Sequence, residues 1–134
     1  MAEHPNVQRI RDAYAAFSVG DLGAALKDLA PDAVFHFGGE GPLSGDRVGA
    51  EAISAALVDV FTTTGGTQKL DIKGIYADDT YGVVVLRETA SRPDGATLDV
   101  EEVHVLGING EGQITELTDL PNDPDAHDRF FDGK

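Results

Sequence analysis

Glu102 and His104 are the residues whose types and spacing most directly suggest chemistry. They stand two positions apart in residues 98–106, where apolar and polar side chains alternate. Alternation predicts a β-strand, and side chains two apart lie on the same face of a strand. The other residues of that parity are apolar, so a carboxylate and an imidazole share a face with core residues. Histidine titrates near neutral pH and can move protons, so this face predicts the wall of a pocket with an acid/base pair.

A second strand is predicted directly after the first. Residues 113–120 follow the turn at Asn109-Gly110, and Asn-Gly is a strong signal for a tight hairpin. A tight turn would place Glu102 opposite Asp119 and His104 opposite Leu117. Two facing carboxylates raise the pKa of one of them, so one could serve as an acid while the other serves as a base.

Arg87 is the cation expected beside this pair. If the turn at residues 93–95 is also tight, Arg87 lies opposite Val100 and diagonal to Glu102, within about 7–8 Å. It would then hold the carboxylates together or polarise a substrate oxygen. Two alternatives stay open: the charges form an ordinary ion-pair network on a solvated sheet face, or a one-residue slip of register turns a whole strand over.

The elements that must position these residues divide the chain in two. Helical spacing of apolar residues predicts helices from Pro5 to the residue before Gly20, from Asp21 to Pro31, and over about 50–63. Strands are predicted over 33–37, 67–77, 81–92, 98–106 and 113–120, with a loop over 38–46 and an acidic tail over 122–134. We expect Phe130 and Phe131 to attach this tail to the body or to a partner. Helices followed by antiparallel strands indicate the α+β class in a single domain, 1–134.

Composition limits the classes of function. The 134 residues carry 24 acidic and 10 basic side chains, a net charge of −14, and no cysteine. The charge argues against nucleic acid or an anionic membrane as a partner, and the lack of cysteine excludes disulfides and thiolate chemistry. With no secretory signal and no membrane-spanning run, the expected location is cytoplasmic. Four histidines without ligand spacing lead us to expect no metal and no cofactor.

Several segments resemble the SnoaL-like and ketosteroid-isomerase-like group of the nuclear transport factor 2-like superfamily. They are residues 6–17, 20–22, 29–36, 64–67, 98–105 and 114–119. The resemblance implies a cone-shaped fold, in which a strongly curved, mostly antiparallel sheet wraps around three N-terminal helices and an apolar cavity. It also implies a homodimer formed through the sheet. The expected cavity lining is Phe17, Phe35, Phe37, Phe61, Val100 and Leu117.

The resemblance to steroid isomerases is partial. Tyr14 matches the tyrosine that donates to the oxyanion, and His104 falls where those enzymes place a protonated aspartate. Phe37 stands where they place the general base, so that mechanism is doubtful for this chain. His36 has the opposite parity to Phe37 and would point away from the cavity, toward an interface.

The resemblance to epoxide hydrolases is also partial. Arg87 and Asp119 look like the arginine and last-strand aspartate of limonene epoxide hydrolases, whereas Thr89 replaces their other aspartate. Glu102 could restore that carboxylate from the neighbouring strand. In SnoaL-type cyclases an aspartate late in the chain is the acid/base, and Asp119 is the nearest candidate.

These observations favour a small-molecule pocket protein that uses acid/base chemistry without a cofactor. Isomerisation, cyclisation and epoxide hydrolysis all fit, on a small apolar or carbonyl-containing substrate. The alternative is a non-catalytic ligand-binding or scaffold homodimer with the same fold, because one fold hosts many functions. The expected catalytic residues are Tyr14, Arg87, Glu102, His104 and Asp119.

Overall fold

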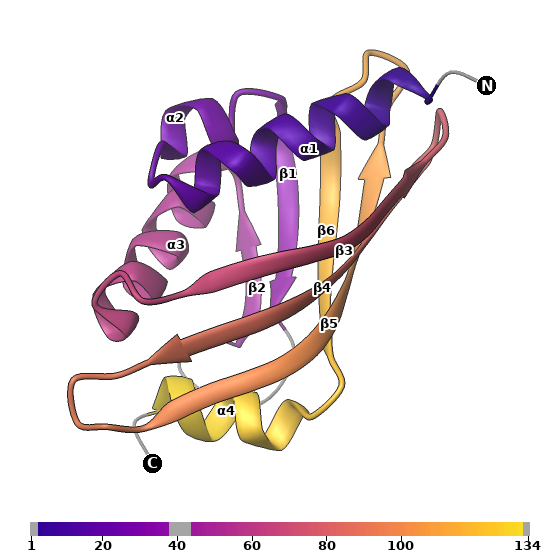
Figure 1. Ribbon diagram of the computed structural model, residues 1–134. Helices are drawn as coiled ribbons and strands as arrows, with labels where there is room; N and C mark the ends of the chain where they lie inside the picture. The colour runs from indigo at the N-terminus through magenta and orange to yellow at the C-terminus, as the bar shows by residue number, and fades with distance from the viewer. Residues whose placement is uncertain (1–2, 38–43, 133–134) are drawn as a thin grey trace.

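The computed structural model describes residues 3–37 and 44–132 as helices packed on one face of a curved sheet (Figure 1). The elements are α1 (Pro5–Ser18), α2 (Leu22–Ala25), β1 (Leu29–Phe37), β2 (Gly45–Val48), α3 (Ala50–Thr64), β3 (Lys69–Ala77), β4 (Tyr81–Ser91), β5 (Thr97–Ile108), β6 (Ile114–Pro121) and α4 (Pro124–Asp132). None of the helices in the described ranges is both long and apolar enough to cross a membrane.

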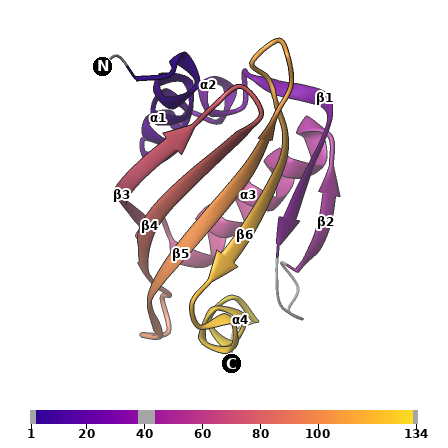
Figure 2. The same ribbon diagram turned by 90° about the vertical axis from the view of Figure 1, so that its right-hand side faces the viewer.

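The six strands form one sheet in the order β2-β1-β6-β5-β4-β3. Strands β1 and β6 pair in parallel, and the other neighbours pair antiparallel. Figure 2 shows the twist of the sheet, with α1, α2 and α3 on one face and α4 at its lower end. The α+β class and the curved, mostly antiparallel sheet are confirmed.

Local signals account for the N-terminal helices. In α1 the His4 side chain accepts a hydrogen bond from the Asn6 N–H, and Pro5 occupies the first turn, where its missing N–H costs nothing. The Asp21 side chain caps α2 by accepting from the Ala24 N–H. Helix α1 can approach the sheet closely because residue 82 is glycine: a Cβ there would lie 2.6 Å from Ile10 Cδ1. This close approach places the α1 side chains over β4 and β5.

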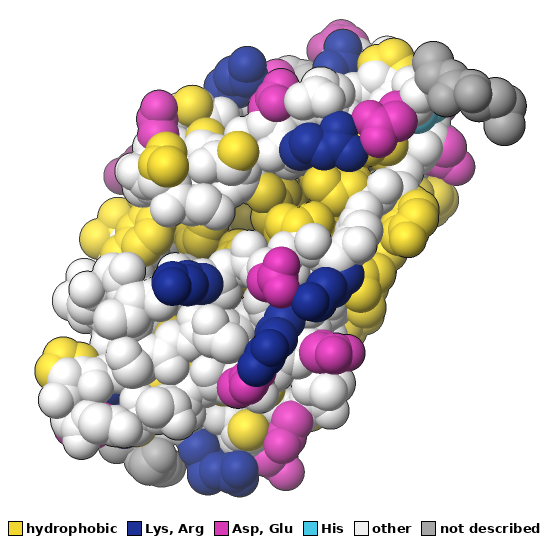
Figure 3. Space-filling view, in the orientation of Figure 1, with side chains coloured by type: hydrophobic (Ala, Val, Ile, Leu, Met, Phe, Trp, Pro, Cys, Tyr) yellow, Lys and Arg dark blue, Asp and Glu magenta, His cyan; other side chains and the backbone are white. Residues whose placement is uncertain are grey.

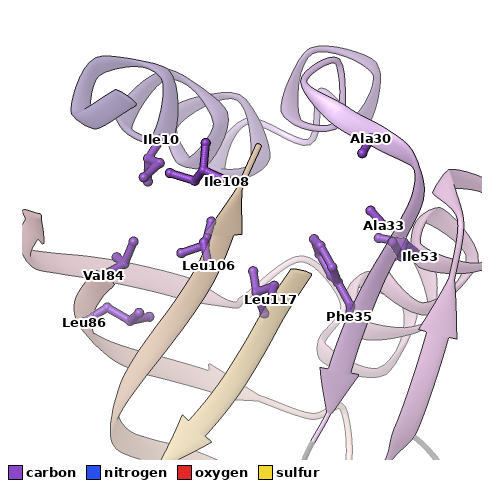
Figure 4. Packing of buried hydrophobic residues seen from close by; sticks show 10 residues of the cluster. All are labelled: Ile10, Ala30, Ala33, Phe35, Ile53, Val84, Leu86, Leu106, Ile108 and Leu117. Atoms are coloured by element: carbon purple, nitrogen blue, oxygen red, sulfur yellow. The ribbon is translucent and has the colours of Figure 1, made fainter. Parts of the chain in front are cut away.

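The main core lies between the helices and the sheet (Figure 4). Ile10 of α1 and Ile53 of α3 are almost fully buried. In Figure 4, Ile10 lies on the side of Val84 and Leu106, and Ile53 lies beside Ala33 of β1. A second, smaller core lies at the other end, where α4 covers the ends of β4 and β5. Its buried residues are Ala90, Leu98, Val100 and Phe130.

Four features differ from the sequence-based expectation. The helix expected to reach Pro31 ends at Ala25, and strand β1 begins at Leu29 rather than at 33. The strand includes Pro31, which an edge or irregular strand position tolerates. Strand β2 lies partly in the segment expected to be loop; the rest of that segment, 38–43, lies outside the described residues. The acidic tail contains a helix, α4, and Phe130 in it is 3% exposed against the body.

The outer face of the sheet is largely apolar at its centre. Val83 pairs with Val105 and Val85 with Val103, and all four side chains are half-buried. They alternate with buried inward residues such as Val84, as their parity predicts. Leu120 on the adjacent strand is 51% exposed.

Candidate active site

Strands β5 and β6 bring His104 and Asp119 directly opposite each other. The predicted register, Glu102 opposite Asp119 and His104 opposite Leu117, is therefore wrong by two positions. The connection over 109–113 is longer than a two-residue turn, and the pairing shifts between Gly107 and Ile108. A two-residue shift preserves which face each side chain occupies, so Glu102, His104 and Asp119 still share the inner face.

Tyr14 of α1 completes a chain of contacts through His104. The Tyr14 hydroxyl lies 2.6 Å from His104 Nδ1, within hydrogen-bond distance. On the other side of the ring, His104 Nε2 lies 3.1 Å from Glu102 Oε1 and 3.3 Å from Asp119 Oδ1. The imidazole is thus fixed at both nitrogens, once by a hydroxyl and once by carboxylates.

This chain of contacts borders an apolar cavity of about 120 Å³. Tyr14, His104 and Asp119 supply its polar side-chain groups, and the remaining lining is aliphatic or aromatic. Tyr14 also borders a groove of about 390 Å³ between α1 and β3. Figure 3 shows apolar side chains at the bottom of this groove, which offers a route from solvent toward Tyr14.

The predicted lining is confirmed only in part. Phe17, Phe35, Phe37 and Leu117 border the cavity. Phe61 does not: it stacks on Phe17 with ring centroids 5.1 Å apart and lines a neighbouring pocket. Val100 is buried in the second core beneath α4, because the sheet is longer than the cavity and residue 100 lies beyond its end.

Arg87 lies outside the site, so its predicted place beside Glu102 is wrong. It pairs with Glu101 rather than Val100, and its guanidinium binds Asp99, with Nε 2.7 Å from Oδ1. The connection over 92–96 joins Ser91 to Thr97 and shifts the register by one residue. A shift of one turns the strand over, so Arg87 faces outward and Glu88 faces inward.

Glu88 and His127 are the buried charged groups that the sequence reasoning missed. Glu88 is 2% exposed on the inner face of β4, and His127 is 8% exposed on α4. Asn122-Asp123-Pro124 could have revealed α4, because Asp is a common N-cap and Pro a common first helical residue. Asp123 does accept a hydrogen bond from the Ala126 N–H.

A small inner cavity of about 70 Å³ joins these residues to the first site. Its polar lining consists of Gln68, Glu88, Glu102, His104, Asp119 and His127. His127 Nε2 lies 3.4 Å from Glu88 Oε1 and 3.7 Å from Glu102 Oε2. The Gln68 amide donates to the other oxygen of Glu88. Glu102 therefore lies between two histidines, with one oxygen toward each.

Burial and pairing shift the pKa values of the residues at the apolar cavity. Burial raises the pKa of the Tyr14 hydroxyl. Burial alone would favour the neutral His104 ring, but Tyr14 and the Asp119 carboxylate outweigh it and raise the pKa of His104 to about 10. Burial likewise opposes the Asp119 carboxylate, yet His104 lowers its pKa below the ordinary value. These opposite shifts favour the charged forms of both residues, whose Nε2 and Oδ1 lie 3.3 Å apart.

The inner carboxylates titrate differently from each other. Burial and the neighbouring Glu88 and Asp119 raise the pKa of Glu102 far above its ordinary value. Burial also opposes the charge of Glu88, but His127 and Glu102 lower its pKa. Burial favours neutral His127, and Glu88 raises its pKa in spite of that. The raised pKa favours the protonated form of Glu102, which lies between the pairs His104–Asp119 and His127–Glu88.

His36 points away from the cavity, as its parity predicts. Its Nδ1 lies 2.7 Å from Asp46 Oδ1 and its Nε2 3.2 Å from Glu116 Oε2. These three residues link β2, β1 and β6 on the outer side of the sheet. Hydrogen bonds to both carboxylates raise the pKa of His36.

Comparisons with known proteins show the family of the chain and related folds. A family model described as a SnoaL-like domain matches residues 10–117. The uncharacterised protein Rv0034 of Mycobacterium tuberculosis is 30% identical over 132 residues, which covers 98% of this chain and 99% of that protein. Bal32a, from a soil-derived mobile gene cassette, is 31% identical with a TM-score of 0.88, covering 94% of this chain and 95% of that chain. A protein of unknown function with a cystatin-like fold from Xanthomonas campestris is 21% identical with a TM-score of 0.87, covering 96% and 98%.

Proposed function

The chain belongs to the SnoaL-like domain family, and from this premise we propose that it is an acid/base enzyme that forms an enol or enolate from a small, largely apolar carbonyl compound. Return of the abstracted proton from the base to a different carbon would give double-bond isomerisation. Attack of the enolate carbon on a second carbonyl group of the same molecule, whose oxygen then takes up that proton, would give aldol-type ring closure. The observation that carries the proposal is the hydrogen-bonded contact of Tyr14 with His104, itself paired with Asp119, at the wall of an otherwise apolar cavity.

Asp119 is the proposed base. Its carboxylate borders the apolar cavity, and pairing with His104, whose Nε2 lies 3.3 Å from Oδ1, lowers its pKa and favours the ionised form. An ionised carboxylate at the cavity wall can accept the α-proton of a bound carbonyl compound. The electron pair of the broken C–H bond would move to the carbonyl oxygen.

Tyr14 is the proposed donor to that oxygen. Its hydroxyl contacts His104 Nδ1 at 2.6 Å and borders the cavity. A hydrogen bond aimed at developing negative charge is strong where water is excluded. His104 would act as a positioning residue, because it orients the donor through Nδ1 and the base through Nε2.

Two alternative mechanisms receive less support. Arginine-bridged epoxide hydrolysis needs a guanidinium between two carboxylates, but Arg87 binds Asp99 on the outer face. The steroid isomerase mechanism needs a base at residue 37, which is a phenylalanine that lines the cavity. Asp119 reaches the cavity from another strand and can supply a base in its place.

The cavity also limits the size of the substrate. Apolar cavities of about 150 Å³ bind a molecule the size of benzene. The cavity of this protein, at about 120 Å³, therefore suits a single ring or a short chain, with any further part lying in the groove between α1 and β3. We expect small cyclic or branched ketones and enones to be the most useful first probes.

Exchange of α-protons in heavy water tests the proposal without requiring the identity of the natural substrate. The protein is incubated in D₂O with a panel of small ketones, and loss of the α-proton signals is followed by NMR. We expect exchange with at least one ketone, abolished in Asp119→Asn. Asp99→Asn is the matched control, since it removes a carboxylate from the same sheet but on the outer face.

The same panel separates catalysis from binding. If a ketone binds the cavity but wild-type protein and Asp119→Asn leave its α-protons equally unexchanged, the enzyme proposal is rejected and the ligand-binding alternative takes its place. Chemical-shift changes at Tyr14 and Leu117 would identify binding in the cavity independently of turnover.

We further propose that the protein is a homodimer joined through the outer face of its sheet. The support is the row of Val83, Val85, Val103 and Val105 at the centre of that face, beside exposed Leu120. Contiguous apolar surface of this kind marks protein–protein contacts.

A further inference from the structure

Glu88, Glu102 and His127 form a second cluster that the proposed catalysis does not use. Each comes from a different element, β4, β5 and α4 respectively, and each is less than 10% exposed. One ligand atom from each lies within 4.8 Å of the other two. The three side chains also border the inner cavity of about 70 Å³, which is large enough for an ion with water but too small for an organic substrate.

The cluster contains polar atoms without hydrogen bonds. Glu88 Oε1 and Glu102 Oε2 are fully buried, and neither makes a hydrogen bond within the described part of the chain. Both face His127 Nε2, at 3.4 Å and 3.7 Å, beyond the usual N–H···O distance of about 2.9–3.0 Å. Buried polar atoms are nearly always satisfied, so these oxygens need a partner between them, either a proton on Glu102 or a cation, and the test below distinguishes the two.

The separations between His127 and the two glutamates are close to those of metal ligands. Zinc binds oxygen and nitrogen ligands at about 2.0–2.2 Å in a tetrahedral arrangement, which places two ligand atoms about 3.3–3.6 Å apart. The distances from His127 Nε2 to the two carboxylate oxygens, 3.4 Å and 3.7 Å, lie at or close to this range. Two carboxylates would also neutralise a divalent cation, which removes the cost of burying them as anions.

We propose that Glu88, Glu102 and His127 bind one divalent first-row transition-metal ion, with Zn²⁺ as the first candidate. An imidazole with two carboxylates and no thiolate suits Zn²⁺, Mn²⁺ or Fe²⁺. Three protein ligands leave a position for water from the inner cavity. This assignment differs from the expectation of no metal site, which rested on spacing along the chain; here the ligands come from three separate elements.

The neighbouring set Glu102, His104 and Asp119 fits a metal less well. It also meets the distance criterion, but His104 already contacts the Tyr14 hydroxyl at Nδ1 and Glu102 Oε1 at Nε2. Its nitrogens are therefore occupied by hydrogen bonds. Glu102 contributes a different oxygen to each set, so metal binding at Oε2 leaves the contact of Oε1 with His104 in place.

Metal binding would affect the stability of this end of the molecule. The ion would join α4 to the sheet, since His127 is on the helix and both glutamates are on strands. Binding would stabilise the folded chain, because the unfolded chain holds no such arrangement of ligands.

Calorimetry with Zn²⁺ on the chelator-treated full chain is the primary test. We expect one equivalent to bind, and His127→Gln and Glu88→Gln to lower the affinity at least about tenfold, the lower end of the loss caused by removing even an outer-shell partner. Asp119→Asn should retain binding, which separates this set from its neighbour. His36→Gln is the matched control, because His36 also contacts two carboxylates but at the surface.

Histidine NMR gives a second readout that needs no variant to fold. In wild-type protein with ¹⁵N-labelled histidine, one equivalent of Zn²⁺ should shift the ring signals of His127 and leave those of His36 unchanged. The proposal is overturned if wild type binds no Zn²⁺, which would mean that Glu102 holds a proton only. It is equally overturned if His127→Gln binds as wild type does, or if His36 or His104 is the ring that responds.

Discussion

The Tyr14 hydroxyl can be removed by a substitution that tests its proposed role as the donor to the enolate oxygen. Tyr14→Phe keeps the ring that packs in the cavity and deletes the hydroxyl that contacts His104. If this hydroxyl stabilises an enolate, we expect the rate of α-proton exchange to fall about 10²–10³-fold, the usual effect of losing one oxyanion donor. Exchange kinetics on the most reactive ketone measure this effect.

A slower exchange rate reports on catalysis only if Tyr14→Phe folds as stably as the wild type. The urea midpoint of Tyr14→Phe serves as the control, together with the affinity for a ketone that binds without reacting. A rate equal to that of wild type would assign Tyr14 to packing alone.

For single residues, the alternation of side chains along a strand explains which parts of the candidate site could be predicted from the sequence. Glu102, His104 and Asp119 share a face because side chains alternate, and the two-residue error in their register left that face unchanged. The predicted register between β4 and β5 was wrong by one residue, so Glu88 rather than Arg87 lies on the inner face. The length of the connection over 92–96 decides this register, and turn residues alone do not reveal it.

Helix α4 is the element that connects the tail of the chain to the sheet. Phe130 is 3% exposed among Ala90, Leu98 and Val100, and the Arg92 guanidinium donates to its carbonyl oxygen. We expect Phe130→Ala to lower the free energy of unfolding by about 3–5 kcal/mol, the usual range for a buried phenylalanine. Urea unfolding measures this loss.

Val19→Ala is the control for Phe130→Ala. Val19 is 81% exposed, so its loss should leave the urea midpoint unchanged. If Phe130→Ala is equally neutral, α4 does not stabilise the rest of the chain. The sequence predicts that Phe130 attaches the tail, but not what it packs against, because its partners on the strands lie thirty or more positions earlier.

The three strands β2, β1 and β6 share a pH-sensitive contact through His36. Hydrogen bonds to Asp46 and Glu116 raise the pKa of His36, so folding favours its protonated form. This stabilisation is complete below the unfolded pKa of about 6.5 and disappears as the pH rises through the higher folded pKa. Stability relative to His36→Gln should therefore decrease as the pH rises from about 6.5 into the alkaline range.

Urea midpoints of both proteins across that pH range measure the effect. Added salt should reduce the difference at low pH, since the His36 side chain is 34% exposed and its ion pairs are screened. A difference that is independent of pH would show that the His36 contact does not depend on its charge.

For the whole molecule, the outer face of the sheet predicts how copies associate. Val105 lies at the centre of that face, paired with Val83. If the dimer forms there, Val105→Glu would place two charges in the interface. We expect wild type to sediment as a dimer and Val105→Glu as a monomer with an unchanged circular dichroism spectrum.

Val58→Glu is the matched control for this experiment. It adds the same charge to an exposed valine, 48% exposed, on α3 rather than on the sheet. A monomeric wild type, or equal behaviour of the two variants, would reject the proposed interface.

The parallel pairing of β1 with β6 has a consequence for synthesis on the ribosome. Strand β1 ends at Phe37, but its partner strand β6 begins only at Ile114, and β6 alone connects β1 and β2 to the rest of the sheet. Contacts this distant in sequence slow folding, because a long loop must close before they form. One edge of β1 therefore stays unpaired until nearly the whole chain has been synthesised. We expect a nascent chain stalled before residue 114 to need chaperones to avoid aggregation.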